Sequence, residues 1–129
     1  IPVELNGDKS KALDPAIQKL NEGNVIGIFP EGRRNTERIL QKGKTGAVRL
    51  ALASGVPIMP TGFFGPPGWT KRETAKNYFL RGKEVAVRFG APLNFSQYRN
   101  EPVTHDLLTK LTAELMNAIA ALCGKPYPF

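Results

Sequence analysis

Two arginines and a glutamate follow a short apolar run near the middle of the first half of the chain. Residues 29–34 read Phe-Pro-Glu-Gly-Arg-Arg and come directly after a β-rich run over 25–29. Ligands of open α/β sheets gather where strands end. Gly32 lets the backbone approach a ligand closely, and the fork of Arg34 matches phosphate oxygens. Glu31 could orient the arginines or accept a hydrogen bond from a hydroxyl. We therefore predict a phosphate site here, with a solvated strand-to-helix turn as the alternative.

A second candidate contact for phosphate is Lys44, in the triplet Gly43-Lys44-Thr45. A nucleotide-binding P-loop ends in such a triplet but also has a glycine five residues before its second glycine. That position holds Arg38. A P-loop is therefore not expected, and Lys44 is interpreted either as a point charge for a phosphate or as a solvated lysine.

An aromatic and basic stretch follows the second predicted strand. It contains Phe63, Phe64 and Trp69, followed by Lys71 and Arg72. Aromatic rings favour the membrane interface, and cations favour anionic headgroups. These five residues are candidates for membrane contact, the alternative being a loop that packs its rings on its own core.

Composition narrows the choice of function. The chain has 129 residues, a length that suits one domain. Its formal net charge of +7 favours an anionic partner, which could be nucleic acid, anionic lipid or a small phosphorylated substrate. No His, Cys and carboxylate cluster has metal-ligand spacing, and no dinucleotide fingerprint is present, so no metal or cofactor is expected. The one histidine, His105, is predicted on the surface, and the one cysteine, Cys123, as a small apolar residue.

The hydrophobic pattern predicts helices alternating with strands, and therefore an α/β fold with a partly parallel sheet flanked by helices. Ser10 or Asp14 could cap the first helix, Thr104 the last, and Gly124 ends the last one. The run 25–29 lacks polar alternation and is predicted to be covered on both faces. The expected elements are helices over 11–22, 46–54 and 105–123, and strands over 25–29, 56–64 and 84–89.

Several stretches resemble one family, the glycerolipid (lysophosphatidate) acyltransferases. Residues 29–35 resemble its Phe-Pro-Glu-Gly-Thr-Arg-Ser block, and residues 56–60 resemble its later Val-Pro-Ile-Val-Pro block at the expected distance. Residues 42–51 resemble the Lys-x-Gly-Ala-x-x-Leu-Ala stretch that lies between them. Residues 1–3 and 87–93 resemble two further strands, so the likeness runs over most of the chain.

The resemblance implies a glycerol-3-phosphate acyltransferase-like fold, with residues 1–129 as a single domain. It implies an enzyme of phospholipid biosynthesis that moves an acyl group from acyl-CoA or acyl-carrier protein to a lysophosphatidate-type acceptor. The residues carried over as binding the acceptor phosphate are Glu31, Gly32 and Arg34, with Lys44 helping. The acyl thioester is a co-substrate, no cofactor is implied, and the expected location is cytoplasmic, at the inner face of a membrane, with no specific nucleic acid partner.

The sequence departs from the family pattern in three ways. Arg33 and Asn35 replace the threonine and serine of the block, and Leu5 stands where an arginine is usual. The family's His-x-x-x-x-Asp block, which supplies the catalytic base, is not found, because the residue five positions after His105 is Lys110. We therefore expect no catalytic residue in this chain. Because the chain also begins at a residue other than Met, we expect it to be the C-terminal portion of a truncated domain. We expect the chain alone to be inactive. The alternative is a non-catalytic basic module for anionic membrane or nucleic acid.

Overall fold

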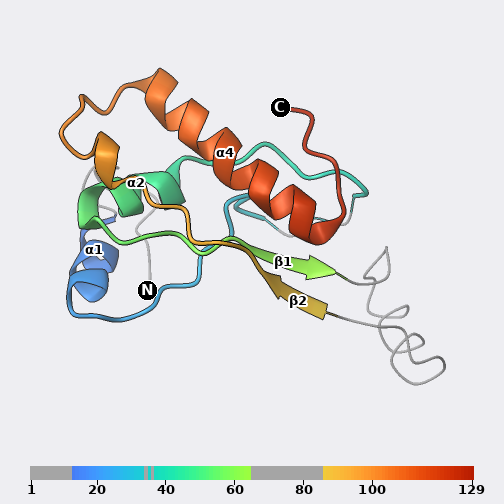
Figure 1. Ribbon diagram of the computed structural model, residues 1–129, viewed down its shortest axis with the longest axis horizontal. Coiled ribbons are helices and arrows are strands. Elements are labelled where there is room, and N and C mark those ends of the chain that lie inside the picture. The colour runs from blue at the N-terminus through green and yellow to red at the C-terminus, as the bar shows by residue number, and fades with distance from the viewer. Residues whose placement is uncertain (1–12, 34, 36, 65–85) are drawn as a thin grey trace.

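The computed structural model describes residues 13–33, 35, 37–64 and 86–129. A long helix, α4, crosses above a two-stranded ladder, and the two shorter helices lie toward the other end (Figure 1). The elements in chain order are α1 (Asp14–Asn21), α2 (Gly46–Ser54), β1 (Thr61–Phe64), β2 (Ala86–Phe89), a 3-10 turn (Ser96–Tyr98) and α4 (His105–Cys123).

Helix α4 provides four of the six largest fully buried side chains among the described residues. Its fully buried side chains recur at three- and four-residue spacing on one face: Leu108, Leu111, Leu115 and Met116. The helix begins where the Thr104 hydroxyl accepts a hydrogen bond from the backbone N–H of Leu107 (3.2 Å), and it ends at Gly124 in the left-handed conformation (φ +65°). The last predicted helix is confirmed with both of its ends.

Helix α2 completes the core from the other side. Val48, Ala51 and Leu52 pack with Phe95 against the N-terminal half of α4. Gly55 closes this helix with φ +75°, a conformation that a side chain disfavours. The predicted helix over 46–54 is confirmed as well.

Strands β1 and β2 form an antiparallel ladder in which Gly62 faces Arg88. A Cβ on Gly62 would collide with the Leu122 side chain and lie 2.8 Å from the Leu122 carbonyl carbon, so the glycine lets β1 approach the end of α4. The predicted strand over 56–64 is regular only after Pro60, because proline cannot donate to a ladder; before it, Ile58 forms one isolated bridge with Leu93. Of the predicted strand over 84–89, residues 84 and 85 lie outside the described residues.

Two expectations about the sheet need correction. The run 25–29 forms no strand within the described residues, and Val25 and Phe29 are 96% and 86% exposed, so a strand covered on both faces is wrong here. β-Propensity favours an extended backbone, but a strand also needs a hydrogen-bonded neighbour. The one ladder among the described residues is antiparallel, not parallel.

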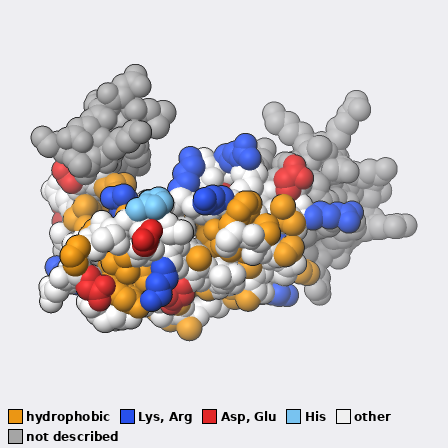
Figure 2. Space-filling model, turned by 90° about the horizontal axis from the view of Figure 1, so that it is seen from above, with side chains coloured by type: hydrophobic (Ala, Val, Ile, Leu, Met, Phe, Trp, Pro, Cys, Tyr) orange, Lys and Arg blue, Asp and Glu red, His pale blue; other side chains and the backbone are white. Residues whose placement is uncertain are grey.

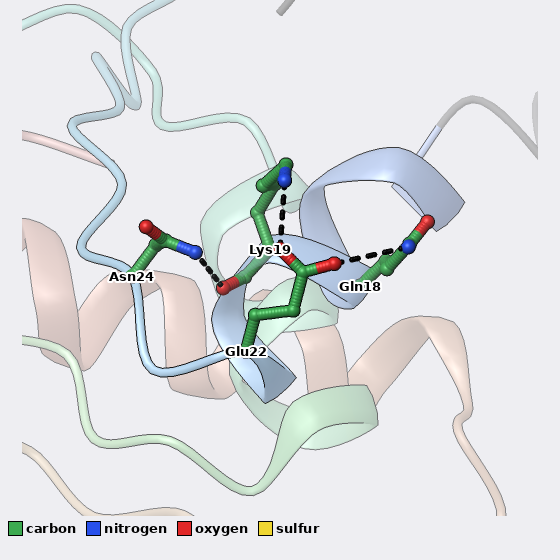
Figure 3. A network of polar contacts seen from close by, with 4 residues as sticks. All are labelled: Gln18, Lys19, Glu22 and Asn24. Atoms are coloured by element: carbon green, nitrogen blue, oxygen red, sulfur yellow. Dashed lines mark hydrogen bonds and ion pairs between the residues drawn. The ribbon is translucent and has the colours of Figure 1, made fainter.

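Helix α1 is tied at its end by a small polar network. Glu22 accepts hydrogen bonds from Lys19 (2.7 Å) and Gln18 (3.0 Å), and the Asn24 amide donates to the Lys19 carbonyl (3.1 Å), as Figure 3 shows. Gly23 (φ +83°) follows the end of the helix. The helix begins after Leu13 with a proline in its first turn, one residue from the predicted Asp14 cap; the alternative start at Ser10 lies outside the described residues.

Candidate phosphate-binding site

The 30–44 loop connects the run 25–29 to α2, and its two ends lie together. The backbone N–H of Lys44 donates to the Pro30 carbonyl (2.8 Å), and the N–H of Gly32 donates to the Phe29 carbonyl (3.0 Å). The first bond closes the loop and the second makes a tight turn at its start. Arg34 and residue 36 lie outside the described residues, so the predicted role of Arg34 stays a prediction.

Glu31 braces the inside of this loop. One oxygen of its half-buried carboxylate, Oε2, accepts hydrogen bonds from the backbone N–H of Gln41 (2.7 Å) and from the Asn35 side-chain amide (2.5 Å). The same amide donates to the Ile39 carbonyl (2.8 Å), and its oxygen accepts from the N–H of Glu37 (2.7 Å). The structure thus places Glu31 against the loop's own backbone.

Gly32 and Lys44, two of the residues singled out in the sequence, are brought together. Gly32 has φ +71°, and a Cβ built on it would lie 2.6 Å from Lys44 Cε and 2.7 Å from Lys44 Nζ. The lysine stem therefore lies across the glycine backbone. Lys44 is exposed, and its ammonium group forms no ion pair with any described residue. This arrangement offers an accessible cation beside an open turn, which suits one phosphate oxygen.

Gln41 organises a second cation at this site. Its side-chain oxygen accepts a hydrogen bond from the guanidinium of Arg33, while its backbone N–H is the one held by Glu31. Arg33 is exposed. No pattern in the sequence pointed to Gln41, because an isolated glutamine at this distance from the motif is not characteristic of any site.

The outer side of the loop is held by residues 125–127, which follow α4 and are called the tail below. The Lys125 ammonium donates to the Glu37 carbonyl (2.8 Å), and the N–H of Leu40 donates to the Pro126 carbonyl (2.9 Å). The N–H of Gly43 donates to the Tyr127 hydroxyl (3.3 Å). Sequence reasoning read this segment only as the stop of a helix.

The loop also rests on α4 itself. A Cβ on Gly43 would lie 2.5 Å from Met116 Cγ and 2.8 Å from Thr112 Cγ2, so only glycine fits between the loop and the helix. Leu40, in the same loop, is also buried. Thr112 is buried, and its hydroxyl has no hydrogen-bond partner among the described residues.

The membrane-contact candidates divide between the two faces of the ladder. Phe64 lies on the ladder face that α4 covers. The guanidinium carbon of Arg88 lies 4.5 Å from the centroid of the Phe64 ring. Phe63 lies on the other face, which it shares with Val87 and Phe89, 54% and 67% exposed. The remaining candidates, Trp69, Lys71 and Arg72, lie outside the described residues.

The other two residues considered in the sequence lie away from any cluster. His105 is the exposed first residue of α4, as predicted, and Cys123 is its partly buried last residue. In the part of the chain that the structure describes, no three His, Cys, Asp or Glu side chains gather closely enough to hold a metal ion.

Comparison with known proteins agrees with the motifs. The family model described as Acyltransferase matches residues 1–63. The chain is 29% identical over 124 residues to the 1-acyl-sn-glycerol-3-phosphate acyltransferase of Bacillus subtilis, covering 96% of this chain and 57% of that protein. It is 36% identical over 110 residues to the protein of the same name from Haemophilus influenzae, covering 80% of this chain and 44% of that one.

A solved structure shows the same fold. The 1-acyl-sn-glycerophosphate (LPA) acyltransferase PlsC from Thermotoga maritima matches with a TM-score of 0.57 and 22% identity, over 93% of this chain and 45% of that chain. The α/β fold class predicted from the sequence is thereby confirmed. This chain spans about half the length of the relatives it matches. The Acyltransferase family model and the relatives named 1-acyl-sn-glycerol-3-phosphate acyltransferase together support the assignment of the chain to the glycerolipid acyltransferase family.

Proposed function

We propose that this protein transfers a fatty acyl group from acyl-CoA or acyl-carrier protein to the free hydroxyl of a 1-acyl-glycerol-3-phosphate, and that this chain carries the part that binds the acceptor phosphate. The family membership and the names of the relatives support the acyltransferase activity and the acceptor class. The choice of donor rests on the resemblance of the motifs.

The observation that carries the proposal is the position of Lys44 across Gly32. The left-handed turn at Gly32 leaves no side chain between solvent and the lysine ammonium, which is exposed beside it. A phosphate placed there gains a charge-assisted hydrogen bond from Lys44, and the exposed guanidinium of Arg33 adds a second positive charge. Arg34 stands as a further proposed ligand from the motif.

Glu31 acts in this proposal by shaping the loop. Its Oε2 is occupied by two donors from residues 35 and 41. A carboxylate in direct contact with a phosphate would also repel it. We therefore assign Glu31 to the support of the site, and Gly32 and Lys44 to contact with the acceptor.

We propose that this chain does not supply the base that the reaction needs. The acceptor hydroxyl loses its proton and forms a C–O bond with the thioester carbonyl carbon, and the C–S bond breaks to release the thiol. His105 is exposed at the start of α4. In the family's His-x-x-x-x-Asp block an aspartate five positions after the histidine orients the imidazole, but here that position is Lys110. We propose that the chain alone binds acceptor without transferring the acyl group.

Titration calorimetry with sn-glycerol 3-phosphate tests the phosphate site. We expect Lys44→Met to weaken binding by about tenfold, the range for one charge-assisted hydrogen bond. Lys110→Met is the matched control, since Lys110 lies on α4 above the Tyr98 ring. Absence of binding by the unchanged chain, or equal losses in both variants, would contradict the proposed site.

We also propose peripheral contact with an anionic membrane through the ladder face that carries Phe63, Val87 and Phe89. An enzyme acting on a lysophospholipid benefits from an apolar surface at the bilayer interface. No described helix is long and apolar enough to cross a membrane. A single cysteine fits a reducing compartment, and we propose the cytoplasmic side of the membrane.

The arrangement of charge favours the acyltransferase proposal over a nucleic-acid-binding module. On the face shown in Figure 2, the basic side chains of the described residues are scattered among acidic and hydrophobic ones and form no continuous stripe. Arg88 is engaged by the Phe64 ring and the Leu122 carbonyl (3.4 Å). Nucleic-acid surfaces typically gather cations along one track, often with aromatic stacking platforms.

A further inference from the structure

We propose that the tail, residues 125–127, is a strap that positions the phosphate site, and that Tyr127 acts on Lys44 through Gly43. The inference deepens the function proposed above for the 30–44 loop and rests on it. Tyr127 is a positioning residue here: it touches the loop backbone and not the ligand.

The strap is built by the way α4 ends. Gly124 (φ +65°) reverses the chain, and the N–H of Lys125 donates back to the Ala120 carbonyl (3.2 Å). In Figure 1 the tail, in red, turns back beside the segment that leads into α2. Pro126 restricts the backbone between Lys125 and Tyr127. The way in which α4 ends therefore directs the tail toward the 30–44 loop.

Three successive tail residues hold the loop at every third position. Lys125 binds the Glu37 carbonyl, the Pro126 carbonyl binds the N–H of Leu40, and the Tyr127 hydroxyl binds the N–H of Gly43. The first and last of these pairs are separated by 88 and 84 residues in the sequence. A loop backbone without ladder partners needs such external partners to keep one conformation.

Gly43 transmits this restraint to the site. It is held between the Tyr127 hydroxyl on one side and Met116 and Thr112 of α4 on the other. The next residue, Lys44, is fixed by its own N–H to the Pro30 carbonyl (2.8 Å), and its stem crosses Gly32. A shift of the Gly43 peptide therefore moves the ammonium that the proposed function assigns to phosphate.

The test combines amide hydrogen exchange at Gly43 and Leu40, affinity for sn-glycerol 3-phosphate, and the thermal midpoint, on the full 129-residue chain. Tyr127→Phe removes only the hydroxyl. Tyr98→Phe, on the connection between β2 and α4, is the matched control. We expect Tyr127→Phe to speed exchange at Gly43 and to weaken binding by about two- to tenfold, the effect of one neutral hydrogen bond, with the control unchanged.

A second pair of variants keeps the test independent of the tyrosine. Lys125→Met removes the donor to the Glu37 carbonyl, and Lys125→Arg restores a cationic donor at the same position. We expect Lys125→Met to weaken binding by about two- to fivefold and Lys125→Arg to recover it. A purely structural role would lower the thermal midpoint and leave the affinity of the folded protein unchanged, which would overturn the proposal.

The two proposals fail in different ways. If the unchanged chain does not bind glycerol phosphate, the proposed function fails, and exchange at Gly43 alone decides whether the strap exists. If the chain binds but Tyr127→Phe leaves both exchange and affinity unchanged, the strap is overturned and the phosphate site stands.

Discussion

The side chain of Lys44 lies across the backbone of Gly32, so closely that a Cβ on the glycine would be 2.6 Å from Lys44 Cε. These residues stand at opposite ends of the 30–44 loop and meet because the N–H of Lys44 donates to the Pro30 carbonyl. The contact joins the Phe-Pro-Glu-Gly block to the basic stretch before α2. It brings together two motifs that are separate in the sequence.

Replacing Gly32 with alanine should damage both the fold and the site. The new methyl group would meet the lysine stem, and φ +71° disfavours a side chain. We expect a loss of about 1–3 kcal/mol in the free energy of unfolding and at least about tenfold weaker binding of glycerol 3-phosphate. Urea unfolding and calorimetry measure the two effects. Gly27→Ala is the control, because a Cβ there meets no described atom; similar losses in both variants would argue against a specific contact.

Glu31 should be replaceable by glutamine but not by alanine. Glutamine keeps a side-chain oxygen for the donors from Gln41 and Asn35, whereas alanine leaves both donors without it. We expect Glu31→Ala to lower the free energy of unfolding by about 1–3 kcal/mol and Glu31→Gln by less than half of that. Chemical denaturation of the three proteins checks this order. An alanine variant as stable as the unchanged chain would show that the carboxylate does not brace the loop.

Thr112 carries a buried hydroxyl, and we expect its removal to raise the stability of the protein. The hydroxyl has no hydrogen-bond partner among the described residues, and Thr112→Val replaces it with a methyl group of similar size. We expect the variant to gain up to about 1 kcal/mol in the free energy of unfolding. Thr104→Val has the opposite expected sign, a loss of about 1 kcal/mol, because it removes the cap that binds the Leu107 N–H. Destabilisation by both changes, measured by thermal unfolding, would contradict the assignment.

Membrane contact predicts an unequal effect of two exposed apolar residues. Phe89 is 67% exposed on the ladder face away from α4, and Val103 is 54% exposed just before α4. We expect Phe89→Ser to lower partitioning onto phosphatidylglycerol-containing vesicles by about tenfold, as the loss of one buried aromatic ring implies, and Val103→Ser to change it little. Sedimentation with vesicles measures both. Equal behaviour of the two variants would remove this face from the membrane proposal.

The chain alone should release no free thiol from acyl-CoA in the presence of lysophosphatidate. Its one histidine, His105, lacks a carboxylate at the orienting spacing. A thiol-release assay checks this, with the related Bacillus subtilis acyltransferase run in parallel as the positive control. Turnover by this chain would mean that a base other than an imidazole with a paired aspartate operates here.

Much of the local structure follows from short-range rules. The cap at Thr104 and the helix end at Gly124 were both predicted, because each depends on contacts within three or four residues. The α/β class and the family followed from the same local patterns together with the spacing of the motifs. Lys44 and Gly32 were both singled out from their residue types alone.

The tertiary structure decided what the motif residues touch. β-Propensity over 25–29 could not tell whether a neighbouring strand was present, and the described residues provide none. The inward position of Glu31 depends on Gln41, and the fixed position of Gly43 depends on Tyr127, 84 residues away. Sequence by itself determined the chemistry available in the loop, because side-chain types and helix ends are local properties. Its geometry depended on backbone hydrogen bonds between distant segments, which no local pattern encodes.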